Sequence, residues 1–539
     1  PRLSAALAAA LLACAPAFAQ TERLDFGEDD WGAAEEAPGT SEAVAPEGAS
    51  GETERLDFGE DDWGAAPEEA EAPGFLDRLK THFSEGFEPR LISYRAYLQS
   101  ELAFDARRDN RIEDTVFWRG VAYGETRLGI SRHVKTFLSA KGEYVAAVSK
   151  EEDDQDTEFE LREAYVDLDA GDVGPGRLYF RVGRQINSWG GNAFIAPADV
   201  LNPWDVTDFL ELNPEDLRLP VFMARVDYQV KKFNLQFVYI PFFTPMEFDV
   251  VGTDFSIIRP NTAIAGLFSG APGALDPRVL DLIQPLLFVD LDPPKDDLTD
   301  GEYGVRLTGT IGAVDFGLSY FATRRDFPII VSRLPSPSAP FVSSRYPTQN
   351  VWGADVAWAV GGVTLKAETA LTDRSYVQTA APLATIPTAD GPFTVYGTGA
   401  RHFPALSSVI GAEYLIDSAS QSIVSLEFND RWNTGKTRDL LIEKEHNVFS
   451  VFVFRGSYWE DRIQPELRWI HVLSDDSFLL TPKLSYVHDG WLSLTLGGNW
   501  FHGRDDRGLG RRFPLPANAD IFGLYEDNSQ IFFATRVSF

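Results

Sequence analysis

The 539-residue chain contains only one cysteine and two methionines. The cysteine, Cys14, lies in an apolar stretch near the start of the sequence, so the rest of the chain has no thiol for a disulfide bond or for redox chemistry. Beyond residue 20 the sequence also lacks any run of about 18 apolar residues, the length that a transmembrane helix requires. A membrane-spanning form would have to use strands, because only helices and closed barrels pair all of their backbone groups inside a bilayer.

Positive charge is scarce as well. The chain has 48 lysines and arginines against 81 aspartates and glutamates, and its formal net charge is −33. Nucleic acids are polyanions, so this charge excludes them as favoured partners. The acidity is concentrated near the start: residues 21–74 hold 18 acidic residues and two arginines. The remainder of the chain is only moderately acidic.

Recognisable catalytic motifs are missing. The seven histidines are dispersed without the spacing of a zinc site. The sequence has neither a Gly-x-Ser-x-Gly nucleophile motif nor a phosphate-binding glycine loop. We therefore predict that the protein is not an enzyme and needs no metal or cofactor.

Residues 1–19 have the features of a secretory signal peptide. The apolar run at 3–13 is too short to span a bilayer, and Ala17-Phe18-Ala19 forms a small-x-small cleavage site. An alternative is a lipoprotein signal with Cys14 lipidated, although Leu12 fits that pattern poorly. Both interpretations predict export from the cytoplasm.

Residues 20–74 form an acidic segment that contains an internal repeat, because residues 21–34 recur unchanged at 53–66. The segment is rich in Ala, Glu, Pro and Gly, and has too little apolar surface to offset the entropy of ordering, which predicts a disordered tail. The repeat is either a duplicated spacer or a docking motif for a periplasmic protein, whose two copies would raise avidity. In the docking interpretation the apolar anchors are Leu24, Phe26, Trp31, Leu56, Phe58 and Trp63.

After a short connector at 75–91, residues 92–539 show hydrophobic alternation with period two. At 222–230, for example, Phe222, Ala224 and Val226 share one face, while Arg225 and Asp227 share the other. This pattern is typical of amphipathic strands, although a soluble β-sandwich would show it too.

The lengths of the connections distinguish a barrel from a sandwich. Tight turns alternate with mostly long loops, as in outer-membrane barrels, where short periplasmic turns alternate with long extracellular loops. The predicted long loops are 106–116, 186–219, 244–300, 325–347, 373–403, 431–445 and 503–529. We therefore predict an all-β fold, a transmembrane antiparallel β-barrel of about 18 strands with 16 as the alternative, preceded by a disordered N-terminal tail.

Aromatic residues support a barrel in a membrane. The chain ends on an alternating strand whose last residue, Phe539, resembles the signal by which outer-membrane barrels are recognised for insertion, which implies the insertion machinery and outer-membrane lipid as partners. Tryptophans gather near the predicted strand ends, as expected of two aromatic girdles at the membrane interfaces. These are Trp118, Trp352, Trp432 and Trp500 near long loops, and Trp358, Trp459 and Trp491 near short turns.

Residues 183–220 are the least strand-like part of the predicted barrel. Their Gly-Arg-Gln, Trp-Gly and Leu-Asn-Pro-Trp-Asp elements resemble those of a large porin-like outer-membrane family of largely uncharacterised function. That family is related in type to alginate-export and substrate-specific porins. The resemblance implies a channel through the outer membrane, and it covers most of 90–539 without the acidic tail.

The loop at 186–219 is rich in proline and apolar residues that need burial, which favours folding into the lumen over packing on the rim. We predict it to be the constriction of the channel. Its candidate residues are Trp189, Asn192, Asp199, Asn202, Trp204, Asp205 and Asp208. Charged side chains predicted to line the lumen are Arg119, Arg127, Arg225, Arg306, Lys366, Glu427 and Arg468.

The sequence thus predicts a channel in the outer membrane, with its tail in the periplasm, that passes a small solute. The alternative is a non-conducting component of a multiprotein assembly or export system, whose periplasmic partner binds the acidic tail. The mixed signs of the predicted lumen charges argue against a simple anion pore.

Overall fold

The computed structural model describes most of the second half of the chain and large parts of the region before it. The described residues are 90–106, 117–147, 155–190, 196–207, 217–248, 294, 298, 300–332, 342–388, 391–417, 421–435, 444–504, 520 and 522–539. Predictions for the signal peptide, the acidic tail with its repeat, and the connector up to residue 89 lie outside them. In the described residues, no helix combines the length and apolar character needed to cross a membrane.

Eighteen strands form one antiparallel sheet. Its first nine strands are β1 (Arg90–Asp105), β2 (Phe117–Gly129), β3 (Val134–Ala147), β4 (Gln155–Val173), β5 (Gly176–Gln185), β6 (Val221–Val230), β7 (Phe233–Ile240), β8 (Glu302–Ile311) and β9 (Val314–Arg324). The other nine are β12 (Thr348–Val360), β13 (Val363–Thr388), β14 (Gly391–Asp417), β15 (Ser422–Asn433), β16 (His446–Arg455), β17 (Ile463–Val472), β18 (Ser477–His488), β19 (Leu492–His502) and β20 (Gln530–Ser538).

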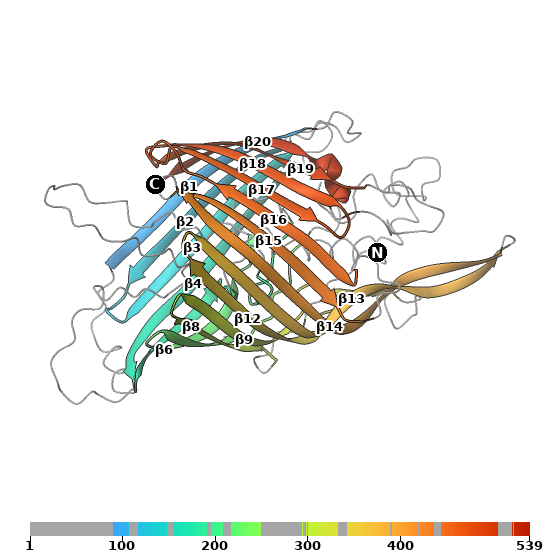
Figure 1. The fold of residues 1–539 in the computed structure, drawn as a ribbon, viewed down its shortest axis with the longest axis horizontal. Helices are drawn as coiled ribbons and strands as arrows, with labels where there is room; N and C mark the ends of the chain where they lie inside the picture. Colours follow the sequence, from blue (N-terminus) through green and yellow to red (C-terminus); the bar gives the residue numbers. More distant parts are fainter. Residues whose placement is uncertain are drawn as a thin grey trace.

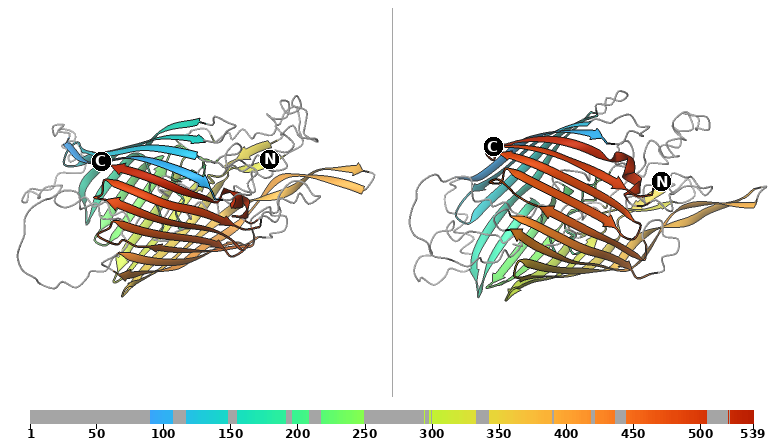
Figure 2. Two further views of the ribbon diagram at one scale, coloured as in Figure 1. Left: turned by 90° about the horizontal axis from the view of Figure 1, so that it is seen from above. Right: turned by 45° about the horizontal axis from the view of Figure 1, so that its top comes forward.

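The sheet closes on itself, because β1 pairs with β2 on one side and with β20 on the other. The closing register runs from Tyr97 opposite Ser538 to Asp105 opposite Gln530. Figures 1 and 2 show the resulting barrel of strongly tilted strands. The prediction of an 18-stranded barrel is confirmed, and the 16-stranded alternative is wrong.

Each strand separates an outer apolar face from an inner polar one. On β1, Leu98 and Leu102 are 53% and 37% exposed on the outside, whereas the intervening Gln99 is 6% exposed and faces the lumen. All seven girdle tryptophans are exposed. This alternation follows from the period of two along a strand, which puts every second side chain in contact with the surroundings of the barrel.

One predicted long loop is a pair of strands instead. Residues 373–403 continue β13 and β14 as a two-stranded ribbon, paired from Ser375–Phe403 to Thr388–Gly391, that projects from the barrel at the end away from the C-terminus (Figure 1). The ribbon contains Pro382 and Pro387, although proline cannot donate to a central ladder. In a two-stranded ribbon each strand has one free edge, so a missing donor is tolerated there.

Two smaller elements lie at the same end of the barrel. A separate hairpin of β10 (Ile329–Ser332) and β11 (Val342–Arg345) occupies the connection between β9 and β12. A short 3-10 helix, η3 (Gly523–Asn528), precedes β20. Phe522 and Tyr525 pack there against Phe501 of β19.

Candidate functional site

The connection between β5 and β6 folds against the inner wall of the barrel. Its described parts are 186–190, 196–207 and 217–220. Trp189 is 2% exposed, and its ring meets Phe321 of β9 edge-on at 5.7 Å between centroids. The apolar cluster that buries this loop consists of Trp189, Leu201, Val221, Met223, Val238, Ile240 and Phe321. Trp189 and Leu201 of the loop are therefore buried on the lumen face of β6, β7 and β9.

A buried polar network holds the start of the loop on the wall. Trp189 Nε1 donates to Gln236 Oε1 at 2.5 Å, and Asn187 Nδ2 donates to the same oxygen at 3.1 Å. Gln236 Nε2 in turn donates to Asp227, which also pairs with Arg225 at 2.6 Å. Because buried polar groups are costly to leave unpaired, these contacts specify one position for the loop.

The loop reaches across several strands. The backbone N–H of Ala198 donates to Glu368 Oε1 of β13 at 2.7 Å, and Arg306 of β8 donates to the carbonyl of Gly190 at 3.3 Å. Ala198 also packs with Val351 and Ala370, from β12 and β13. The loop is thus fixed at its tip as well as at its base.

Asn202 ties the two ends of the loop together. Its side-chain amide donates to the carbonyls of Gln185 and Leu219 at 3.2 and 2.9 Å, and its oxygen accepts the Asn187 N–H at 2.8 Å. A second brace is Arg218, which pairs with Asp199, donates to Ser188 and stacks on the Trp204 ring at 4.9 Å. The acidic Asp199 therefore neutralises a loop arginine rather than facing open solvent.

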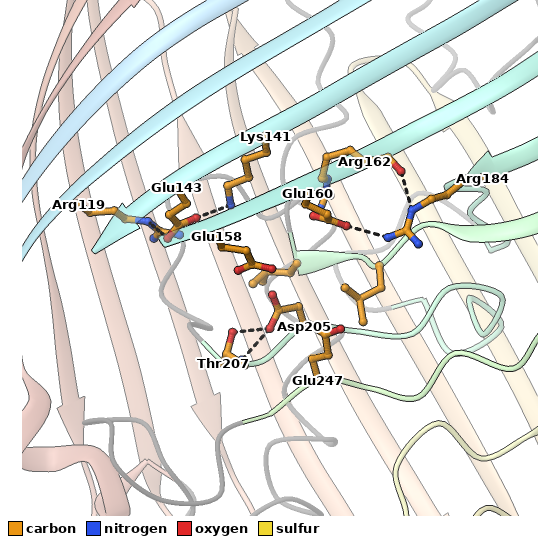
Figure 3. Close-up of a pocket in the computed structure, with 12 residues that line it drawn as sticks. Arg119, Lys141, Glu143, Glu158, Glu160, Arg162, Arg184, Asp205, Thr207 and Glu247 are labelled. Carbon is orange, nitrogen blue, oxygen red and sulfur yellow. Dashed lines mark hydrogen bonds and ion pairs between the residues drawn. The ribbon is translucent and has the colours of Figure 1, made fainter. Parts of the chain in front are cut away.

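A charged cavity of about 130 Å³ lies between the loop and the wall of β2–β5 (Figure 3). On the wall, Glu143 pairs with Arg119 and Lys141 at 2.6 and 2.9 Å. Glu160 pairs with Arg162 and Arg184 at 3.1 and 3.0 Å. Each of these carboxylates is therefore held between two cations.

Three further carboxylates face the same cavity: Glu158 from β4, Asp205 from the loop, and Glu247 from the connection after β7 (Figure 3). Asp205 accepts hydrogen bonds from the N–H and hydroxyl of Thr207 at 3.0 and 2.5 Å. The backbones of residues 204–206 and Glu247 run side by side and exchange hydrogen bonds of 2.9 and 3.0 Å. This pairing brings two loop carboxylates together.

Burial, followed by the negative charges of Asp205 and Glu158, raises the pKa of Glu247 to about 7. The neighbouring Arg184 acts in the opposite direction, and Glu160 adds to the increase. Glu247 lies outside the strands and borders the cavity. The charge of the cavity therefore changes near neutral pH.

In a conducting barrel, the ionic selectivity should depend on pH through this residue. Between about pH 6 and about pH 8 Glu247 goes from mostly protonated to mostly ionised, so preference for cations should increase with pH. Reversal potentials across a salt gradient measure this, and Glu247→Gln should remove most of the change. Asp489→Asn, in the exposed β18–β19 turn, is the control that should keep it. A Glu247→Gln pore with the pH response of the parent would contradict the assignment.

The structure places the predicted lumen charges on the inner face, but most are paired. Arg119, Arg225 and Arg306 are at most 5% exposed. The last of these pairs with Asp355 at 2.7 Å. Lys366 pairs with Glu413 at 2.8 Å, Arg468 contacts Glu466 at 3.2 Å, and Glu427 is 2% exposed. Arg127 is exposed, beside the ring of Phe137.

Of the predicted constriction residues, Trp189, Asp199, Asn202, Trp204 and Asp205 belong to the folded loop described above. Asn192 and Asp208 lie outside the described residues, as do the six docking anchors of the tail. Phe539 is 66% exposed, and its N–H donates to the Ala96 carbonyl at 2.8 Å. In the part of the chain that the structure describes, no three His, Cys, Asp or Glu side chains are grouped to hold a metal ion.

Sequence reasoning missed several residues of the cavity. Glu143 and Lys141 lie on the inner face of β3, and their alternation with apolar neighbours could have identified them. Glu247 had no such signal, because it lies in a long connection and reaches the cavity only by pairing with the loop. Gln236 had no sequence signal either, because its role depends on its hydrogen bonds with Trp189 and Asn187.

Fold and site together define a closed 18-stranded antiparallel barrel with a loop fixed against its inner wall. The chain belongs to the family described as "Protein of unknown function (DUF1302)", which matches residues 1–539. No curated protein sequence matches it.

Several solved structures of outer-membrane proteins are similar at low identity. OmpF of Salmonella typhi, in a complex with daunomycin, is 10% identical, with 85% of this chain and 99% of that chain covered and a TM-score of 0.35. OccAB4 of Acinetobacter baumannii is 8% identical, with 83% and 97% covered and a TM-score of 0.40. A loop-deletion mutant of OmpT, an outer membrane protein of Vibrio cholerae, is 8% identical, with 84% and 99% covered and a TM-score of 0.34. Likenesses this distant do not bear on the function of this chain.

Proposed function

We propose that the protein is an outer-membrane channel for a small solute, with residues 186–219 as its constriction. The observation that carries this proposal is the path of the loop, which leaves β5 and reaches Glu368 on β13 along the inner wall. A loop held there by apolar packing and hydrogen bonds narrows the lumen, whereas a loop packed over the rim would leave the inner wall uncovered.

The outer surface supports a membrane location. Outward-facing apolar residues cover the strands, and tryptophans lie exposed at both ends of the barrel. Closed barrels with such a surface are found in outer membranes, with short turns in the periplasm. Because β1 begins and β20 ends at the short-turn end, we infer that the N-terminal tail and Phe539 lie on the periplasmic side.

The charges beside the loop support passage of ions and polar solutes with a mild preference for cations. Four cations and five carboxylates line the cavity between the loop and the wall. A surplus of negative charge at a narrow section raises the local concentration of cations. Burial of much of this charge in ion pairs keeps the expected selectivity modest.

Planar lipid bilayers test the proposal. Full-length protein, folded in detergent, should produce discrete conductance steps, and a salt gradient should give a reversal potential of the sign for cation preference. Heat-denatured protein in the same detergent is the control. Folded, heat-modifiable protein that inserts without any conductance would exclude the channel.

That outcome would favour the alternative, a non-conducting component of an assembly. The unchanged duplication of residues 21–34 at 53–66 is the observation that supports a periplasmic partner. A peptide covering 53–66 should then retain a periplasmic protein, and a peptide with its apolar anchors replaced should not.

A further inference from the structure

A second group of lumen charges lies on β16–β18, away from the loop and its cavity. Arg455, Glu466 and Lys483 are directly opposite one another on the three neighbouring strands, and Arg468 follows two residues after Glu466 on the same face. Trp469 and Leu484, the adjacent residues in sequence, are exposed on the outside. The alternation therefore turns all four charged side chains inward.

The four side chains make a compact cluster around a single carboxylate. Arg455 Nε lies 3.3 Å from Glu466 Oε2, Arg468 Nη2 lies 3.2 Å from Oε1, and Lys483 Nζ lies 3.7 Å from Oε1. Together they carry a charge of +2. The side chains of Arg455, Lys483 and Glu466 are 11%, 12% and 19% exposed, so they border the lumen without being free in water.

Among the described side chains of β14 and β15, Glu413 and Glu427 are not placed to balance Arg455. Glu413 of β14 is bound by Lys366 at 2.8 Å. Glu427 of β15 lies opposite Val451, four residues along the strand from Ile423, which is opposite Arg455. At about 3.3 Å per residue, that offset is about 13 Å.

The guanidinium of Arg455 has hydrogen-bond donors that its ion pair with Glu466 does not use. Its Nη2 atom is buried and has no hydrogen-bond partner among the described residues. A guanidinium presents its N–H groups as a planar fork that matches the two oxygens of a carboxylate or phosphate. A buried guanidinium donor without an acceptor among the described residues, beside the cations Arg468 and Lys483, is the environment that an oxyanion would complete.

We propose that Arg455 and Lys483, on either side of Glu466, form a binding site for the oxyanion group of a solute, a carboxylate or a phosphate, on the short-turn half of the lumen wall. The placement of this site in a pore rests on the proposed channel function, but binding itself does not require conduction. The site would hold an anionic group of a solute whose other parts face the lumen.

Isothermal titration calorimetry tests the site on full-length protein folded in detergent. The probes are citrate and inorganic phosphate at constant ionic strength. At least one probe should bind to the parent, and Arg455→Gln and Lys483→Gln should each weaken binding by about tenfold, the effect of losing one charge-assisted contact. Glu466→Gln removes the competing carboxylate and should strengthen it. Arg462→Gln, in the exposed turn before β17, is the matched control and should bind like the parent.

The cation variants should weaken binding and Glu466→Gln should strengthen it, and a general loss of stability would not produce these opposite changes in affinity. Absence of binding to the folded parent, equal binding by the parent and both cation variants, or weaker binding by Glu466→Gln would overturn the proposal. Each variant is first checked for heat-modifiable migration, and the two cation variants serve as alternatives if one does not fold. Binding without conductance would support the oxyanion site and exclude the channel. Conductance without binding would support the channel and exclude the oxyanion site.

Discussion

Removal of the last strand, Gln530–Ser538, together with Phe539, is expected to abolish the folded barrel. β20 pairs with β19 along one edge and with β1 along the other, so its loss leaves two long strand edges without partners. Inside a bilayer each unpaired backbone group costs on the order of several kcal/mol, which no local rearrangement can offset. Heat-modifiable migration and the amount of protein in the outer membrane measure the loss, and both should fall to background.

Substitution of Phe539 alone distinguishes recognition of the C-terminal residue during insertion from closure of the barrel by β20. The backbone N–H of Phe539 donates to Ala96 whatever its side chain, and that side chain is 66% exposed, so Phe539→Asp leaves the closing ladder in place. We expect Phe539→Asp to insert poorly and Phe539→Tyr, which keeps a terminal aromatic ring, to insert normally. Normal amounts of folded Phe539→Asp barrel in the outer membrane would contradict a role for this ring in insertion.

The strands of the barrel could be predicted because a closed wall with an apolar outer face and a polar lumen face imposes a strict chemical alternation. Phe222, Ala224 and Val226 face outward while Arg225 and Asp227 face the lumen, so period two is visible in the sequence itself. The same constraint does not extend beyond the barrel wall. The ribbon formed by the ends of β13 and β14 projects from the barrel (Figure 1), and its sequence of small residues and prolines resembles a loop.

The candidate site could be predicted only as a segment. Apolar residues such as Trp189 and Leu201 in a proline-rich loop indicated burial, and the structure places them against Met223 and Phe321. Which wall they meet depends on contacts far apart in sequence, such as the bond between Ala198 and Glu368, 170 residues away. No local sequence pattern predicts such a pair, because each residue is compatible with its own loop or strand whether or not the other is present.

Shortening the loop itself is expected to have the largest effect on transport. Replacing residues 192–215 by a short Gly-Ser linker removes the tip that reaches Glu368 while keeping Trp189 and Arg218 at its base. The narrowest section dominates the resistance of a pore, so single-channel conductance should rise by at least about twofold. The pocket vacated beside Met223 should cost some stability, but the ladder of the barrel is untouched.

The ionic selectivity of the loop-shortened barrel should also change, in a direction that follows from the ion pairs of the loop. The replaced segment carries Asp199, the partner of Arg218, and Asp205, which faces the charged cavity. Their loss leaves Arg218 and the wall cations with fewer counter-charges, so the preference for cations should decrease or reverse. Removing residues 380–398 from the projecting β13–β14 ribbon is the matched control, because that ribbon extends away from the barrel (Figure 1) and should leave both conductance and selectivity unchanged. A loop-shortened barrel that folds normally, yet conducts and selects like the parent, would show that the current bypasses this loop, and its buried contacts would then serve only to brace the wall.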